Sequence, residues 1–280
     1  MTKPVTMNPT LHLTQARAPL TEAVTVLDEH GQTRTLSIPA ERALTVYVDK
    51  RELVTLMTLG AHPEWLVLGY LRNQRLFASV DDIESITVDW DAGEDGAGAA
   101  AVKTRHGIVD LAERTARRVV TTGCGQGSVF GDLMADVDRI QLPPARIAQS
   151  RLYAIVNAIR VQESLYKLAG SVHGCALFQG DDLAVFIEDV GRHNALDTIA
   201  GWMWLHGVQA GPDACFYTTG RLTSEMVIKA AQMGVAVVIS RSGITQMGYQ
   251  VAQRLGVCAI GRALHLSLIH ISEPTRRTPI

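Results

Sequence analysis

Residues 214–239 read ACFYTTGRLTSEMVIKAAQMGVAVVI, which is an apolar run, a polar turn, a helical pattern and a second apolar run. Short apolar runs without alternation are typical of strands that are buried on both faces. A helix between two such strands predicts a parallel pair with the helix packed on the sheet. Further apolar runs lie at 175–178, 183–187 and 257–260, and further helical patterns at 191–205 and 245–255. The sequence therefore predicts an α/β domain with a largely parallel sheet covered by helices.

The amino-terminal half has a different pattern. Strand-like runs at 43–48 and 84–89 flank a helical pattern that starts at Pro63, and a Gly/Ala/Asp-rich loop follows at 91–100. These features predict a smaller α+β domain, so that the chain is α+β overall. We expect a loosely ordered lead-in at 1–40, the small domain at 41–120, a cysteine-containing loop and linker at 121–142, and the larger domain at 143–265.

Two segments frame the larger domain. A long helical pattern at 145–168 follows two prolines, which are favourable at a helix start. Residues 266–280 resemble the translation of a transposon-type sequencing adapter and are left out of the fold prediction.

The composition limits the possible partners. Of the 280 residues, 47% are hydrophobic and 19% are charged, and the formal net charge is −2 without basic runs, so neither nucleic acid nor an anionic membrane is an expected partner. No stretch approaches the roughly 18 apolar residues of a membrane helix, and the first residues lack a signal-peptide pattern. We therefore expect a cytoplasmic protein whose four cysteines stay thiols, with no disulfide framework and no metal site.

One cysteine lies in a glycine-rich loop, because residues 121–128 read TTGCGQGS. Backbone N–H groups in such a turn can stabilise a thiolate and lower its pKa from about 8.5. Cys124 is therefore a candidate nucleophile, and a small residue in a flexible turn is the alternative. The other cysteines, Cys175, Cys215 and Cys258, lie in apolar runs, where cysteine behaves as a small buried hydrophobe. Cys175 is the exception to consider, since His173 could share a cleft with it.

Polar turns follow several predicted strands. Residues 188–197 read EDVGRHNALD, where Arg192, His193 and a helix amino terminus favour an anion site. The alternative is an Asp189 N-cap among surface charges. Similar turns occur at 218–225, TTGRLTSE, and more weakly at 240–243, SRSG. Because ligands bind outside the carboxyl ends of parallel strands, Arg192, Arg221 and Arg241 are expected to converge on several phosphates, although each arginine alone would be a surface ion pair.

Four motifs together resemble one known family. They are Gly123-Cys124-Gly125, Ser171-Val172-His173, the string 188–194, and Gly220-Arg221 with Ser224-Glu225. From them the chain is identified as a member of the formate dehydrogenase accessory sulfurtransferase family, FdhD, over about residues 40–265. The resemblance implies a cytidine deaminase-like fold for the larger domain, with a mixed sheet covered by helices, and a homodimer.

The resemblance also implies a function. A family member takes sulfur from a cysteine desulfurase as a persulfide, here on Cys124. It passes this sulfur to the bis(molybdopterin guanine dinucleotide) molybdenum cofactor, of which GDP is an analogue, before the cofactor enters the catalytic subunit of formate dehydrogenase. The cofactor-binding residues that the resemblance implies are His173, Arg192, His193, Asn194, Gly220, Arg221, Ser224, Glu225, Gly261, Arg262, Ala263, Leu264 and His265.

The chain departs from the family in two places. Many members have a Cys-x-x-Cys loop, but Gly127 stands at the second position here, so no disulfide can form within the loop. The adapter-like tail replaces the family's segment after about His265. A chaperone that binds the cofactor without transferring sulfur is therefore the main alternative. A zinc deaminase is a weaker one, because the His-x-Glu and Pro-Cys-x-x-Cys set is absent.

Overall fold

The computed structural model describes residues 11–93, 97–108, 137–264 and 269–272. Its contacts divide the chain into two compact units. The first contains Met1–Thr115, Glu163–His173 and Glu188–His206, and the second contains Ala116–Gln162, Gly174–Ile187 and Gly207–Ile280. The units are interleaved along the chain. Because a compact unit need not be an independently folding domain, the consecutive boundaries at 41–120 and 143–265 stay a prediction.

The first unit contains a five-stranded sheet in the order β1-β6-β7-β4-β5. Its strands are β1 (His12–Leu13), β4 (Arg42–Val48), β5 (Arg51–Thr58), β6 (Ile83–Asp89) and β7 (Gly98–Thr104), and its helices are α1 (Pro63–Asn73), α5 (Leu165–Ala169) and α6 (Arg192–Leu205). The strand predicted at 43–48 and the helix predicted from Pro63 are confirmed. Residues 98–100, predicted as loop, instead begin β7, because its small side chains alternate between buried and more exposed positions.

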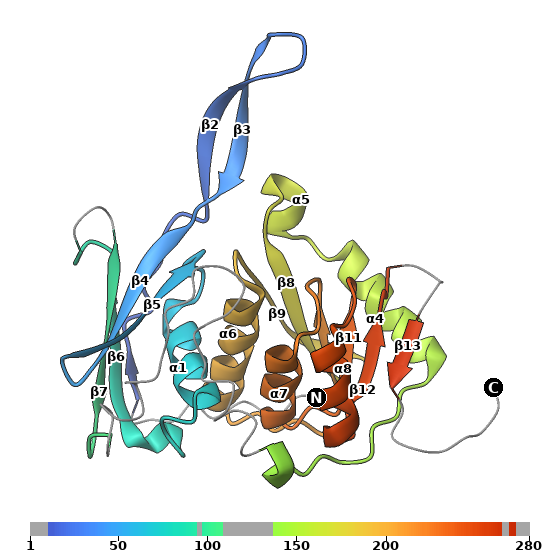
Figure 1. Cartoon of the computed structure of the whole chain (residues 1–280). Coiled ribbons are helices and arrows are strands. Elements are labelled where there is room, and N and C mark those ends of the chain that lie inside the picture. Colours follow the sequence, from blue (N-terminus) through green and yellow to red (C-terminus); the bar gives the residue numbers. More distant parts are fainter. Residues whose placement is uncertain (1–10, 94–96, 109–136, 265–268, 273–280) are drawn as a thin grey trace. The chain divides into compact units, whose positions relative to one another are not determined.

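Helices α1 and α6 lie side by side and touch through glycines (Figure 1). A Cβ atom on Gly69 would lie 1.6 Å from the carbonyl oxygen of Asp197, and one on Gly201 would lie 1.9 Å from that of Trp65. Only glycine allows two backbones to approach this closely. A buried hydrogen bond crosses the same contact, because Asn73 Nδ2 donates to Asp197 Oδ1 at 2.6 Å.

Two further strands, β2 (Thr21–Leu27) and β3 (Thr33–Pro39), form a hairpin with its own two-stranded sheet (Figure 1). The prediction of a loosely ordered lead-in is wrong for these residues. Val24 pairs with Leu36 across the hairpin, so β-branched and apolar residues share one face at a spacing of two. Leu36 and Leu27 are nevertheless 51% and 73% exposed, which explains why no buried apolar run reveals the strands.

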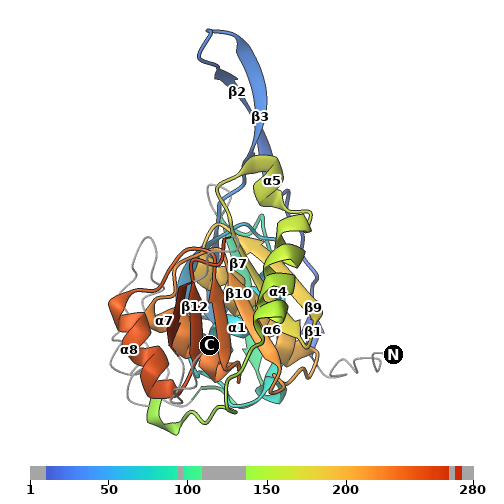
Figure 2. The ribbon, with the colours of Figure 1, turned by 90° about the vertical axis from the view of Figure 1, so that its right-hand side faces the viewer.

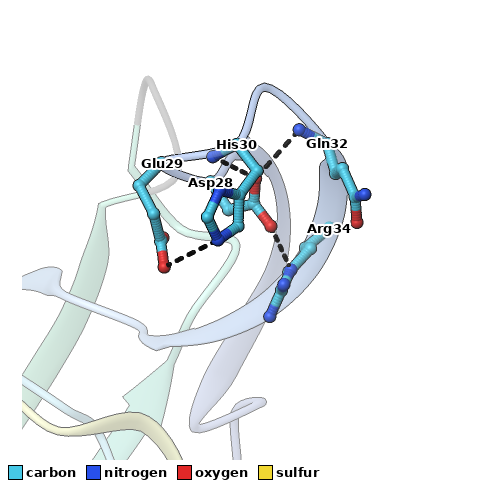
Figure 3. A network of polar contacts seen from close by, with 5 residues as sticks. All are labelled: Asp28, Glu29, His30, Gln32 and Arg34. Carbon is cyan, nitrogen blue, oxygen red and sulfur yellow. Dashed lines mark hydrogen bonds and ion pairs between the residues drawn. The ribbon is translucent and has the colours of Figure 1, made fainter.

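The turn of this hairpin is built around one carboxylate, as Figure 3 shows. Asp28 Oδ1 accepts hydrogen bonds from the backbone N–H groups of His30 and Gln32, both at 2.9 Å, and Oδ2 lies 2.6 Å from Arg34 Nε. Gly31 has a φ of +75°, which glycine adopts at little cost. An aspartate with a glycine three residues later is thus the local signal that closes the hairpin.

The second unit is built on a six-stranded sheet in the order β13-β12-β11-β10-β8-β9. Its elements are β8 (His173–Gln179), β9 (Asp182–Asp189), β10 (Ala214–Thr218), β11 (Val237–Ser240), β12 (Cys258–Gly261), β13 (Ile269–Ser272), α4 (Gln149–Val161), α7 (Ser224–Gln232) and α8 (Gln246–Leu255). In Figure 2, α4 covers one side of the sheet and α7 and α8 cover the other. The α/β class, with an α+β chain overall, is confirmed. The cytidine deaminase-like detail stays a prediction.

The sheet is mixed, as the family resemblance implies, so the prediction of a largely parallel sheet from the apolar runs is wrong. β10, β11 and β12 are parallel, but β8 is antiparallel to β10 and β13 is antiparallel to β12. Only two residues connect β8 to β9, and a parallel connection needs about a dozen. β13 lies within the adapter-like segment.

The long helix predicted at 145–168 is instead two helices. α4 ends at Val161, because Gln162 leaves the helical region with a ψ of 129°. Ser164 then caps α5 by accepting a hydrogen bond from the Lys167 N–H. No helix in the described ranges is long and apolar enough to cross a lipid bilayer.

Candidate functional site

Three turns lie next to one another where the parallel strands β10, β11 and β12 end. The Arg241 N–H donates to the Thr218 carbonyl at 2.9 Å, and the Ala263 N–H donates to the Ser240 carbonyl at 2.9 Å. Ser240 Oγ donates to the Gly220 carbonyl at 2.7 Å. We define the arginine edge as Gly220–Arg221, Arg241–Gly243 and Arg262–Leu264. Its backbone geometry places the turns of Arg221, Arg241 and Arg262 together, as parallel strands require.

Two fully buried hydroxyls hold the arginine edge in shape. Thr218 Oγ1 accepts hydrogen bonds from the Gly220 N–H at 3.1 Å and from Cys175 Sγ at 3.3 Å. Ser240 Oγ accepts one from the Ser242 N–H at 3.0 Å. Neither hydroxyl was singled out from the sequence, although each is the polar last residue of an otherwise apolar strand, which is a usable signal.

The arginine edge is suited to an anion. Arg221 and Arg262 are exposed, and Arg241 is partly exposed. α7 and α8 begin just beyond two of the turns, so their N–H groups and helix dipoles add positive potential. Arg262 has a φ of +54°, a conformation that costs a non-glycine residue about 1 kcal/mol or more. Guanidinium groups at such an edge can bind phosphate oxygens in pairs.

The other residues predicted in this unit lie near the same turns. Ser224 and Glu225 form the first turn of α7 and are partly buried. Gly261 ends β12, Ala263 is buried, and Leu264 is 52% exposed. His265 and Cys124 lie outside the described residues, so the sequence prediction for both stays untested.

A second group of predicted residues belongs to the first unit. Arg192, His193 and Asn194 open α6 and are each about 95% buried, with exposures of 5%, 4% and 5%. His173 begins β8 and is partly exposed. Convergence of Arg192 with Arg221 on one ligand therefore stays a prediction.

The buried carboxylate of Asp189 anchors the start of α6. It accepts hydrogen bonds from Thr58 Oγ1 at 2.5 Å, the Leu59 N–H at 3.2 Å, the Gly191 N–H at 3.0 Å and Asn194 Nδ2 at 3.0 Å. Burial nevertheless raises the pKa of Asp189 to about 6, because desolvation outweighs the four donors. The surface-charge interpretation of this motif is wrong, since these side chains lie in the interior.

Other residues of the motif also serve the fold. Asn194 Nδ2 donates to the Met57 carbonyl at 2.7 Å, which ties α6 to the end of β5. The Glu188 carboxylate accepts hydrogen bonds from the N–H groups of Leu165 and Tyr166 at 2.5 and 3.1 Å and so caps α5. The sequence shows that residues 188–194 are unusually polar, but it does not show which residues they contact.

Comparison with protein families and known proteins identifies the relatives of this chain. The model of the FdhD/NarQ family matches residues 39–276. The chain belongs to the FdhD/NarQ family. A protein of Bacillus pumilus named sulfur carrier protein FdhD is 30% identical over 234 residues, which are 81% of this chain and 85% of the relative. One of Bacillus licheniformis with the same name is 32% identical over 229 residues, 81% and 84% of the two chains.

The fold of this FdhD/NarQ chain is also seen in a crystal structure. It is that of a protein from Desulfotalea psychrophila that is named only provisionally as a formate dehydrogenase accessory protein. The two superpose with a TM-score of 0.69 at 22% identity, over 91% of this chain and 98% of the other. At this identity the similarity shows only that the two proteins share a fold.

The three described cysteines of the FdhD/NarQ chain are buried, as their apolar runs predict. Cys175 and Cys215 are 0% exposed and Cys258 is 3% exposed. Burial raises the pKa of the Cys215 thiol to about 11, which keeps it protonated at neutral pH. In the described part of the chain, no three metal-ligating side chains are grouped as a metal site needs.

Proposed function

We propose that this FdhD/NarQ chain is a sulfurtransferase that carries sulfur as a persulfide on Cys124. Its relatives are named sulfur carrier proteins, which supports the general role. The burial of Cys175, Cys215 and Cys258 carries the residue assignment, because a buried thiol cannot reach the active site of a donor protein. Cys124 is the remaining cysteine of the chain.

In this proposal a cysteine desulfurase supplies the sulfur. The Cys124 thiolate attacks the outer sulfur of the desulfurase persulfide, a new S–S bond forms on Cys124, and the desulfurase cysteine leaves as a thiolate. The S–S bond on Cys124 then breaks and leaves a Cys124 thiolate, and the outer sulfur passes to the bis(molybdopterin guanine dinucleotide) molybdenum cofactor, which is the substrate. A dithiol reductant supplies the two electrons that bring this sulfur to the sulfide level. The cofactor is afterwards inserted into the catalytic subunit of formate dehydrogenase.

The arginine edge is the proposed binding site for the phosphates of this cofactor. Three arginine turns and two helix amino termini supply positive charge there, and GDP carries the same guanine and phosphate groups as the cofactor. Ser224, Glu225 and the residues Gly261 to His265 would complete the site. His173, Arg192, His193 and Asn194 of the first unit are proposed as further cofactor-binding residues. We also propose a homodimer that works in the cytoplasm.

Incubation with a cysteine desulfurase and cysteine should add one sulfur, about 32 Da, to the intact protein. The added mass should be absent from Cys124→Ala and should disappear with reductant. Cys258→Ala is the matched control, since that buried thiol should not affect uptake. Intact-protein mass spectrometry measures the added mass in wild type, Cys124→Ala and Cys258→Ala. Equal uptake by Cys124→Ala would reject Cys124 as the carrier, and normal formate dehydrogenase activity with that variant would favour the cofactor chaperone.

Arg221→Ala should weaken GDP binding about 10- to 100-fold, because a charge-assisted contact to phosphate is lost. Calorimetric titration measures the affinity, and a thermal melt shows whether the fold is kept. Arg160→Ala removes an exposed arginine from α4 and should leave the affinity unchanged. Unchanged affinity in Arg221→Ala with an intact melt would place the ligand elsewhere.

A further inference from the structure

The hairpin of β2 and β3 has one apolar side. Glu22 pairs with Ile38 and Val24 with Leu36, and side chains two positions apart along a strand share a side. Val24, Val26, Leu36 and Ile38 therefore lie together, and we define these four side chains as the apolar face. Leu36 and Ile38 are 51% and 42% exposed. The opposite side is mostly small and polar, with Thr21, Ala23, Thr25, Thr33, Thr35 and Ser37.

The fold of a single chain does not account for the apolar face. β2 and β3 form a sheet of their own, and β3 is exposed at every position from Thr33 to Ile38. A two-stranded hairpin by itself is only marginally stable in water. Six of the ten large apolar side chains that are exposed in the described residues lie in residues 20–38 and in α5, which contacts β3. Such a concentration marks an interaction surface.

The charges beside the apolar face indicate what covers it. Glu22 lies on the same side next to Ile38 at the base of the hairpin, and Arg34 lies on it next to Val26 near the tip. The two charged side chains are 62% and 58% exposed. The apolar face therefore has a negative end and a positive end. A surface of this kind is complementary to a second copy of itself turned end for end.

Only one of the two ways of stacking the hairpins satisfies these charges. A two-fold axis across the strands places the base of one hairpin over the tip of the other, so that Glu22 lies level with Arg34 of the second copy. Symmetry creates this charge pair twice. A two-fold axis along the strands would instead place base over base and bring like charges together. In the first arrangement the apolar side chains interdigitate between the charge pairs, as in packed sheets.

We propose that the apolar face is a contact of the homodimer, in which the hairpins of two copies pack face to face and end for end. This inference rests on the proposed function in one respect, because it names the surface that holds the proposed homodimer together. Sulfur uptake by Cys124 does not depend on it.

Leu36→Glu should weaken the dimer about 100-fold or more, because two symmetry-related carboxylates would be buried in an apolar contact. Thr35→Glu is the matched control, since it places the same charge on the neighbouring exposed residue of β3 but on the opposite side. Its dimer dissociation constant should stay within about threefold of wild type. Sedimentation equilibrium measures the dissociation constants, and a thermal melt of each variant reports the fold.

A charge reversal tests the arrangement of the two copies. Glu22→Arg should weaken the dimer about tenfold, because the new guanidinium meets Arg34 of the second copy at both ends. Adding Arg34→Glu reverses the second charge and should restore the dissociation constant to within about threefold of wild type.

Three results would overturn the inference: a dimer that is unaffected by Leu36→Glu, an equal loss in Thr35→Glu, or no recovery in the double charge reversal. If Leu36→Glu does not fold, the charge-reversal variants decide. A monomeric wild type would reject the homodimer and this inference together. The sulfur carrier is judged separately, because the mass gain on Cys124 is measured whether or not the protein dimerises.

Discussion

Gly69→Ala should destabilise the protein by about 4 kcal/mol or more, which is at the upper end for a single substitution. A Cβ atom there would lie 1.6 Å from the Asp197 carbonyl oxygen, and the obstacle is backbone that cannot rotate away. α1 and α6 must then separate, and every side chain packed between them loses contact. Urea unfolding followed by circular dichroism measures the loss.

Gly211→Ala provides the control for this substitution. A Cβ atom on Gly211 would meet only the Gln179 side-chain oxygen, at 3.7 Å, which is an ordinary contact. Its unfolding free energy should stay within about 0.5 kcal/mol of wild type. Similar stability of Gly69→Ala and Gly211→Ala would mean that the two helices do not touch as described.

The second prediction concerns Asp189, whose pKa of about 6 in the folded protein lies above its ordinary value of 3.8. Between these values the folded state holds a proton that the unfolded state has lost, so stability falls as pH rises. This loss of stability is absent below pH 3.8 and complete above about pH 6. The difference corresponds to about 3 kcal/mol between pH 3.5 and pH 7.

Asp189→Asn should remove this part of the pH dependence, because an amide does not ionise. The unfolding free energy of wild type and variant, measured by urea at several pH values, should diverge by about 3 kcal/mol across the range. Asp182→Asn, an exposed position of the same strand, should run parallel to wild type. Parallel curves for wild type and Asp189→Asn would show that this carboxylate is not desolvated.

Much of the second unit could be predicted from its sequence, because its strands are apolar along their whole length. The runs at 214–218 and 257–260 coincide with β10 and β12 to within one residue. The mixed sheet, which the family resemblance implied, was not predicted from the apolar runs, although the four residues between the runs at 175–178 and 183–187 are too few for a parallel connection. The hairpin of β2 and β3 was missed because its side chains are largely exposed.

The candidate site was harder to predict, because its supporting contacts join distant parts of the chain. Asp189 meets Thr58 across 131 positions, so no local pattern shows that the polar string at 188–194 turns inward. Lys229 is another example. In EMVIKAAQ it looks like an ordinary solvated helix lysine, and only the packing around α7 shows that it is buried.

The interleaved order of the two units has a consequence for synthesis on the ribosome. Asn73 of α1 cannot form its hydrogen bond until Asp197 of α6, which lies 124 positions later in the sequence, has been translated. At about 5–20 residues per second, roughly 6–25 s pass before the partner helix is translated. During that interval the apolar surface of α1 lacks its cover, and the nascent chain is open to aggregation. We therefore expect holdase chaperones to engage this protein while it is still being translated.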